Sequence, residues 1–277
     1  MLWFSRSVPP PDTAARSLEH WSEAGRREME AFYALAVEDY RQLAGARDWG
    51  ADLARQAVDG RVRLLDVACG SGKFPAALLE AGLPAHPVVE VDLLDPSAFS
   101  IAEARAVLAP PFVAAGEHET VLQDFAAPAR YDVAWATHAL YAIPPAELDA
   151  AVAAMVAALR PGGFGVVAQA CARSHYLAFY EAYRADHPAT PFTTAEEVVE
   201  ALQGLGVDPA VRTLRYRTAV TDRAVVEGYL RRCAFDDSLT LDGMESRGAL
   251  AGYLAGCRDA DGYTFTHQVE LITWTGR

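Results

Sequence analysis

Residues 61–74 read RVRLLDVACGSGKF, and this stretch decides the fold. Four of the six residues 62–67 are apolar, which predicts a short strand buried on both faces. Small residues follow at Gly70 and Gly72, and helix-forming residues resume over residues 74–80. A strand, a glycine turn and a helix together predict a ligand lying against bare backbone at the N-terminus of that helix.

Two phosphate-binding motifs fit this loop poorly. Two glycines at this spacing are weak evidence by themselves, because many tight turns contain them. Pro75 stands where a dinucleotide-binding loop would carry its third glycine, and Lys73 lacks the rest of a P-loop. The loop therefore favours an adenosyl ligand that is uncharged on its 5′ side.

The segment LLDVACGSGKF resembles motif I of the class I S-adenosylmethionine-dependent methyltransferases, where that family carries D-x-[AG]-C-G-[ST]-G. The resemblance implies a Rossmann-like α/β fold with an N-terminal helical cap and a C-terminal helical excursion over the pocket. It implies S-adenosylmethionine as cofactor, S-adenosylhomocysteine as product and no metal. It also implies cofactor contacts from the loop, at Asp66, Ala68, Gly70, Ser71 and Gly72.

A second acidic strand end follows about 25 residues later. Residues 86–94 predict a strand, and a carboxylate at its end can accept both ribose hydroxyls of an adenosine. Asp92 and Asp95 compete for this role. We favour Asp95, because Asp95 and Pro96 followed by a serine and a helix look like motif II of the family. Ser100, one turn into that helix, is a further candidate contact.

The region after the third strand, residues 112–115, offers candidates for contacting adenine. In the family, a polar side chain from this region reaches the adenine amine. Thr120 and the pair Gln123–Asp124 both lie in the expected loop, residues 117–125. The spacing does not decide between them.

A fourth strand, residues 131–136, leads into Thr137, His138 and Tyr141. The carboxyl end of such a strand faces the ligand in open α/β sheets, and in the family it faces both cofactor and methyl acceptor. Thr137 is therefore a candidate cofactor contact, and His138 and Tyr141 are candidates for the acceptor pocket. His138 would orient or deprotonate the acceptor; alternatively, it caps a helix or packs against Leu140.

The sequence LRPGG, residues 159–163, precedes a fifth strand at 164–169 and matches the turn that follows motif III in the family. We expect one compact domain in three parts: a helical cap (1–60, with a loose Pro-rich segment at 1–12), the cofactor-binding core (61–172) and a C-terminal part (173–277). The C-terminal part predicts helices at 174–185, after Thr194, at 222–232 and at 244–255, with strands at 210–220 and 263–274.

This layout is similar to histamine N-methyltransferase and its bacterial relatives. Where that enzyme uses two amide side chains, this sequence has His138 and His267, so the acceptor need not be histamine. We expect both histidines to be catalytic candidates. The family's N-terminal helix offers an acidic residue to the acceptor amine, and Glu38, Asp39 or Arg41 falls near that position. Tyr33 and Glu38 on this helix are expected to bind substrate.

Composition narrows the function classes. The formal net charge of −13 over 277 residues argues against a nucleic-acid partner, and no apolar run is long enough to span a membrane. Four scattered cysteines favour a reducing, cytoplasmic compartment over a zinc site or a disulfide framework. The remaining histidines are dispersed, which makes a magnesium site unexpected. We expect a monomer or a homodimer.

The sequence therefore predicts a methyltransferase that acts on a small metabolite, in keeping with secondary metabolism, by in-line methyl transfer. N-methylation is slightly favoured, although a histidine base would suit O- or C-methylation. The alternative is a catalytically inactive S-adenosylmethionine-binding protein that serves as a regulatory or partner subunit.

Overall fold

The computed structural model describes residues 13–20, 22 and 26–277, so the Pro-rich segment 1–12 lies outside the described residues. Three helices precede the sheet: α1 (Thr13–His20), α2 (Arg26–Ala44) and α3 (Trp49–Gln56). The helical cap expected over residues 1–60 thus contains these three helices, and residues 21 and 23–25 between the first two are not described. None of the helices in the described part has both the length and the apolar character needed to cross a bilayer.

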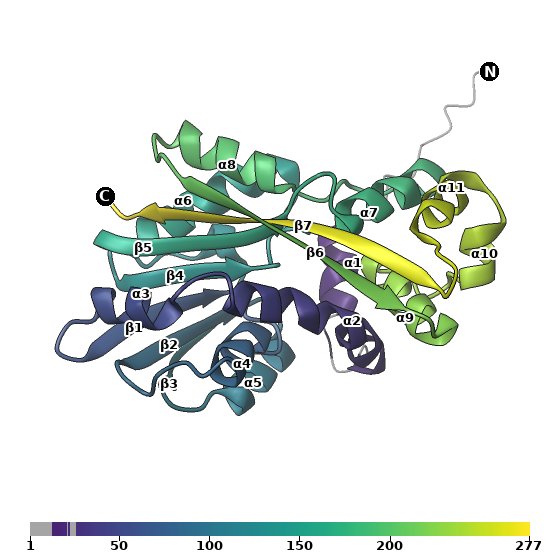
Figure 1. Cartoon of the computed structure of the whole chain (residues 1–277). Coiled ribbons are helices and arrows are strands. Elements are labelled where there is room, and N and C mark those ends of the chain that lie inside the picture. The colour runs from purple at the N-terminus through teal and green to yellow at the C-terminus, as the bar shows by residue number, and fades with distance from the viewer. Residues whose placement is uncertain (1–12, 21, 23–25) are drawn as a thin grey trace, which may run out of the picture.

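One seven-stranded sheet forms the centre of the molecule, in the order β3-β2-β1-β4-β5-β7-β6 (Figure 1). β7 is antiparallel to both of its neighbours, β5 and β6, while the pairs among β1 to β5 are parallel. This arrangement confirms the predicted α/β fold. The strands are β1 (Arg61–Val67), β2 (Val88–Asp95), β3 (Phe112–Glu119), β4 (Tyr131–Thr137), β5 (Leu159–Ala170), β6 (Ala210–Val220) and β7 (Tyr263–Thr275).

Helices cover both faces of the sheet because its central strands are apolar on both sides; every residue of β4 is buried. One face packs against α3, α4 (Lys73–Glu80) and α5 (Ala98–Val107). The other packs against α6 (Leu148–Ala158) and α8 (Ala195–Gly204). Two short 3₁₀ helices, η1 (Leu122–Asp124) and η2 (Pro145–Glu147), lie in the connections around β4.

A third hydrophobic cluster lies beyond the carboxyl ends of the parallel strands. It joins α2 to α7 (His175–Asp186), α9 (Arg223–Ala234), α10 (Leu241–Ser246) and α11 (Gly248–Cys257). The long strands β6 and β7 extend out of the sheet to reach these helices (Figure 1). The N-terminal and C-terminal helices therefore share one core above the edge of the sheet where a ligand would bind.

Three predicted boundaries were wrong. β3 continues to Glu119 instead of ending at residue 115, because Gly116 accommodates the Asp92 carboxylate at a register shift in β2. β5 begins at Leu159 instead of residue 164, because the LRPGG segment stays in the strand at a second register shift, opposite residues 131–133. The helix expected at 244–255 is two helices, since Gly248 has φ +80° and interrupts it.

Candidate functional site

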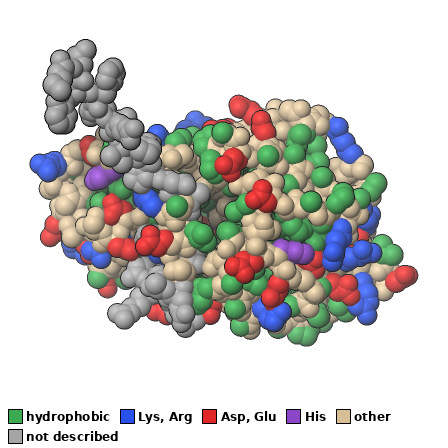
Figure 2. Space-filling view, turned by 180° about the vertical axis from the view of Figure 1, so that it is seen from behind, with side chains coloured by type: hydrophobic (Ala, Val, Ile, Leu, Met, Phe, Trp, Pro, Cys, Tyr) green, Lys and Arg blue, Asp and Glu red, His purple; other side chains and the backbone are tan. Residues whose placement is uncertain are grey.

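A cavity of 360 Å³ lies at the carboxyl ends of the parallel strands. Residues at the ends of four strands line it: Val67 of β1, Asp95 of β2, Thr137 of β4 and Ala170 of β5. Residues of α1, α2, α7 and α9 line it from the opposite side. In Figure 2 the surface is hollowed near the centre of the view, among hydrophobic side chains and beside the residues drawn in grey.

Two carboxylates mark the half of the cavity next to the glycine loop. Asp66, near the end of β1, is 3% exposed, and its Oδ2 has no hydrogen-bond partner among the described residues. Burial raises its pKa to about 7. Asp95 accepts the N–H of Ser97 at 2.9 Å and the N–H of Gly70 at 3.1 Å, and burial raises its pKa to about 6. Asp95 therefore ties the end of β2 to the glycine loop.

The glycine loop needs its glycines for backbone conformation and for close packing. Gly70 and Gly72 have φ of +51° and +69°, in the left-handed region. A Cβ on Gly72 would lie 2.5 Å from Cγ2 of Val107, so α5 could not pack against a larger residue there. Ser71 turns toward α2, where its hydroxyl donates to Tyr33 Oη at 3.2 Å.

Aromatic rings form the other half of the cavity. On α2, the lining residues Phe32, Tyr33, Ala36, Asp39 and Tyr40 recur at spacings of three and four, which places them on one helical face. The facing rings come from segments far apart in the sequence, namely Tyr141, Tyr176, Tyr229 and Phe235. The acceptor side is thus an apolar pocket with few polar groups, as is usual for sites that bind small molecules.

Asp39 is the carboxylate of this aromatic half. Its Oδ1 accepts the hydroxyl of Tyr216 at 2.6 Å and lies 3.7 Å from His267 Nδ1. Tyr216 and His267 face each other across β6 and β7, with stacked rings 4.8 Å apart, and His267 Nε2 lies 2.9 Å from Thr218 Oγ1. Burial raises the pKa of Asp39 to about 7 and lowers that of His267 to about 4. At neutral pH His267 is therefore an uncharged support for Asp39.

His138 is held in place from two sides. Its backbone has φ +55° and its N–H donates to the carbonyl of Ala168 at 2.8 Å, which fixes the ring at the end of β4. Its Nδ1 lies 2.9 Å from Tyr141 Oη, and that oxygen accepts the N–H of Ala170 at 3.0 Å. Since the Tyr141 proton has no other acceptor in the described part of the chain, we assign it to Nδ1 and the imidazole proton to Nε2.

His138 Nε2 is buried, and no described residue is its hydrogen-bond partner. Burial, with a smaller contribution from His267, lowers the His138 pKa to about 4, so the ring is neutral at pH 7. In this tautomer His138 offers the cavity an N–H donor rather than a basic lone pair.

Comparison with known proteins agrees with this geometry. Residues 64–163 match the family described as "Methyltransferase domain". Together with the sheet order and the cavity, this match decides the identity of the core. Residues 64–163 form a methyltransferase domain. No curated protein matches the chain in sequence.

Solved structures of methyltransferases share the fold of this domain. A magnesium protoporphyrin IX methyltransferase from Synechocystis PCC 6803, with bound S-adenosylhomocysteine, is 12% identical with a TM-score of 0.55, covering 94% of this chain and 99% of its own. A methyltransferase from Thermotoga maritima, described as a possible histamine N-methyltransferase, is 13% identical with a TM-score of 0.50, covering 93% and 99%.

The YcgJ protein from Bacillus subtilis is 12% identical with a TM-score of 0.56, covering 83% of this chain and 98% of its own. At these identities the likeness concerns the fold.

The methyltransferase domain brings most of the expected cofactor residues to one place. Those that line the cavity are Asp66, Ala68, Gly70, Asp95, Pro96 and Thr137. Ser71, Gly72, Ser100 and Thr120 lie outside the lining, and Ser100 serves the N-terminus of α5, where its N–H donates to Ser97 Oγ at 3.2 Å. Of the adenine candidates, Gln123 lines the cavity and Asp124 does not.

Asp92, the alternative to Asp95, is engaged elsewhere. Its carboxylate accepts the hydroxyl of Tyr131 at 2.7 Å and contacts His118 and Arg130. It does not line the cavity. Of the two carboxylates, Asp95 is therefore the one that lines the cavity.

The expected substrate residues divide in the same way. Tyr33, His138, Tyr141 and His267 line the cavity, whereas Glu38 contacts Gln42 and Arg41 on the outer side of α2. Sequence reasoning missed Tyr40 as a lining residue, although its spacing from Tyr33 and Ala36 was a usable signal. No group of three or more His, Cys, Asp or Glu in the described residues is arranged to hold a metal ion.

Proposed function

We propose that this protein is an S-adenosylmethionine-dependent methyltransferase of a small-molecule metabolite, with N-methylation favoured over O- or C-methylation. One observation carries the proposal: a single cavity joins the glycine loop, Asp66 and Asp95 to an aromatic pocket that contains Asp39. The first half suits an adenosyl amino acid, and the second suits an organic cation.

The residues of the cofactor half fit the proposed cofactor. The unpartnered Oδ2 of Asp66 is an acceptor for the ammonium of the amino-acid part. Asp95, which two backbone N–H groups hold at the end of β2, would accept the ribose hydroxyls. When bound, the cofactor supplies an electrophilic methyl group on a sulfonium, which departs readily. The protein's contribution is then mainly orientation and exclusion of water, worth up to about 7–11 kcal/mol when the geometry is ideal.

The acceptor half favours an amine. Aromatic faces attract ammonium groups, and Asp39 adds a partly buried carboxylate that lines the same cavity. With a pKa of about 7, Asp39 holds a protonated amine and accepts its proton near neutral pH, which frees the nitrogen lone pair. Tyr216 and His267 position the Asp39 carboxyl group. His138 would donate a hydrogen bond to a second polar atom of the acceptor.

Calorimetric titration with S-adenosylhomocysteine tests the cofactor site. The wild type is expected to bind it, and Asp95→Ala is expected to weaken binding about 100-fold, because charge-assisted hydrogen bonds are lost. The control is Asp124→Ala, an exposed carboxylate near the cavity that does not line it. A wild type that does not bind S-adenosylhomocysteine would contradict the proposal.

Measuring turnover distinguishes an active methyltransferase from a catalytically inactive S-adenosylmethionine-binding protein. We expect S-adenosylhomocysteine to form from S-adenosylmethionine with members of a panel of small aromatic and aliphatic amines, and more slowly with matched phenols. Cofactor binding without turnover on any amine, phenol or carbon acid would instead favour a regulatory subunit.

A further inference from the structure

Lys73 is the feature of the glycine loop that the proposed function leaves unexplained. It is the only lysine in the 277-residue sequence, in which Lys and Arg together number 24. It is also the only Lys or Arg among the described residues that line the cavity. Three lining carboxylates, Asp39, Asp66 and Asp95, share that cavity with it.

The position of Lys73 is unfavourable for a cation. It is the first residue of α4, where the helix dipole favours acidic side chains, and the first turn contains none. Gly72, the N-cap, has no side chain to cap the helix, the N–H of Gly72 donates to Cys69 and Pro75 has no N–H. Among the described residues of this helix end, the N–H groups of Lys73 and Phe74 are therefore the ones available to a ligand. A cation and free N–H groups together create a local positive potential beside the cavity. A basic residue at the start of a helix goes against the preference for acidic side chains there, and such exceptions are expected at functional sites.

The side chain of Lys73 is nevertheless held in place. Its Nζ lies 4.4 Å from the ring centroid of Tyr33, a partly buried tyrosine of α2 that also accepts the hydroxyl of Ser71. No ion pair links Lys73 to a carboxylate in the described part of the chain. The aromatic face therefore orients the ammonium without neutralising it.

Asp66 supplies a second, independent observation that points to a ligand. It lies four residues before Gly70, on the other side of the same loop, and its buried Oδ2 has no partner among the described residues. A buried acceptor and an oriented cation on the two flanks of one loop match the two charges of an α-amino acid. Amino acids carry an ammonium and a carboxylate on adjacent atoms, so both flanks can be engaged together.

We infer that Lys73 binds the α-carboxylate of the cofactor's amino-acid part, assisted by the N-terminus of α4, while Asp66 binds the α-ammonium. This assignment rests on the proposed function, since it presupposes the adenosyl amino acid. On this assignment Lys73 binds the ligand's carboxylate, and Tyr33 positions the Lys73 ammonium group.

A cycle of two ligands and two proteins tests the assignment by calorimetry. The ligands are S-adenosylmethionine and decarboxylated S-adenosylmethionine, which differ in the carboxylate alone. Lys73→Met is expected to weaken binding of the first about 10- to 100-fold and to change binding of the second less than about twofold. The wild type is expected to prefer the first ligand by the same factor. Lys73→Arg, which keeps the charge, is expected to restore binding to within about fivefold.

Arg105→Met is the matched control, because Arg105 lies on α5 next to the loop and pairs with Glu117 outside the cavity. It is expected to leave both affinities unchanged. Equal losses for both ligands in Lys73→Met, or no loss for either, would overturn the assignment and leave Lys73 as packing on Tyr33. Failure of the proposed function looks different: the wild type would then bind neither ligand.

Lysine-selective ¹³C labelling gives a readout that does not depend on affinity. Since the chain has one lysine, a protein with a lysine-free tag yields a single side-chain spin system. We expect its ε resonance to move when S-adenosylmethionine binds, and to move much less at saturation with the decarboxylated analogue. Equal shifts with both ligands would also overturn the assignment.

Discussion

The two halves of the cavity handle charge in different ways. The cofactor half places Asp66, Asp95 and Lys73 around backbone N–H groups of a tight loop. The acceptor half has one carboxylate, Asp39, among aromatic rings, and its histidines are neutral because burial lowers the pKa of His138 and His267 to about 4. Under the proposed function, the first half would recognise a ligand of fixed charges, whereas the second would respond to whether its ligand carries a proton. A mutation in one half of the cavity should therefore affect ligand binding or turnover through that half and leave the other half unchanged.

The largest expected effect separates the acceptor half from the cofactor half. Asp39→Asn keeps the acceptor oxygen for the Tyr216 hydroxyl but removes the charge and the base. We expect kcat/KM for an amine acceptor to fall about 100- to 1000-fold, in line with about 3–4 kcal/mol for a lost buried charge contact. The dissociation constant for S-adenosylhomocysteine should change less than about twofold. Steady-state kinetics and calorimetry measure the two quantities.

Glu38→Gln is the matched control for Asp39. It removes the adjacent carboxylate of α2, which contacts Gln42 and Arg41 outside the cavity. Both kinetic and binding constants should stay within about twofold of wild type, as for a surface ion pair. If the two variants lose activity equally, charge on α2 acts at long range and Asp39 has no specific role.

The next effect distinguishes a donor from a base at His138. His138→Ala removes the buried group and is expected to lower kcat/KM about 10- to 100-fold. His138→Gln can place an amide N–H near the position of Nε2 but cannot act as a base at neutral pH. We expect it to recover activity to within about fivefold of wild type. If His138→Gln lowered kcat/KM as much as His138→Ala does, His138 would act as a base.

Residues of the cofactor half are close in sequence, and this explains why they could be predicted. Asp66, Gly70 and Gly72 belong to one short loop whose conformation depends on local chemistry. The choice between Asp92 and Asp95 was harder, because it depends on which residue ends β2. β2 ends at Asp95, while Asp92 accepts the hydroxyl of Tyr131 at the start of β4, two strands away in the sheet.

The acceptor half could be predicted only in part, because tertiary packing assembles it. A helix turns about 100° per residue, so a one-residue shift from Asp39 to Glu38 moves a side chain from the cavity to the outer face. Tyr176 comes from α7, whose other aromatic residues are core, and Tyr229 and Phe235, from α9 and its C-cap, belong to a core cluster themselves. Periodicity marks the buried face of such a helix but does not separate rings that line a cavity from rings that fill a core.

A smaller effect concerns the pH dependence of cofactor binding. Asp66 must be ionised to hold an ammonium, and its pKa in the free protein is raised to about 7. Affinity should therefore be complete at high pH and fall as the pH drops: from pH 8 to pH 6 the titration of Asp66 lowers it about tenfold, and that of Asp95 lowers it about a further twofold. In Asp66→Asn only Asp95, with a pKa of about 6, remains to titrate, so the change should shrink to about twofold.

Calorimetric titrations with S-adenosylhomocysteine at several pH values check this prediction, with buffer ionisation corrected. The two histidines, with pKa values of about 4, should not contribute above pH 5. The opposite sign, with tighter binding at low pH, would contradict an ionised Asp66 as the ammonium site. An undiminished pH dependence in Asp66→Asn would assign the titration to another group.

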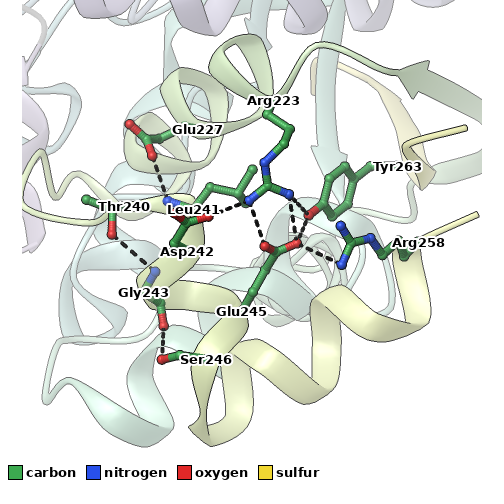
Figure 3. Close-up of polar contacts among 10 residues, drawn as sticks. All are labelled: Arg223, Glu227, Thr240, Leu241, Asp242, Gly243, Glu245, Ser246, Arg258 and Tyr263. Atoms are coloured by element: carbon green, nitrogen blue, oxygen red, sulfur yellow. Dashed lines mark hydrogen bonds and ion pairs between the residues drawn. The ribbon is translucent and has the colours of Figure 1, made fainter.

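The smallest effect is expected at the exposed ion pairs that join α9, α10 and the start of β7 (Figure 3). Arg223 bridges Asp242 and Glu245, and Glu245 also contacts Arg258 and Tyr263. Hydrogen bonds from Arg223 lower the pKa of Glu245, so its contribution to stability is complete above the ordinary carboxyl range and lost as the pH falls below it.

Glu245→Gln tests how far this network matters to the cavity. Because the two arginine partners of Glu245 are exposed, solvent and salt screen the attraction, and we expect Tm to fall by about 2–4 °C or less, with a smaller fall at high salt. Cofactor affinity and turnover should not change, since neither Glu245 nor Arg223 lines the cavity. A loss of turnover at unchanged cofactor affinity would instead show that the C-terminal helices need this network to hold the acceptor wall, and would link the exposed surface to the aromatic half alone.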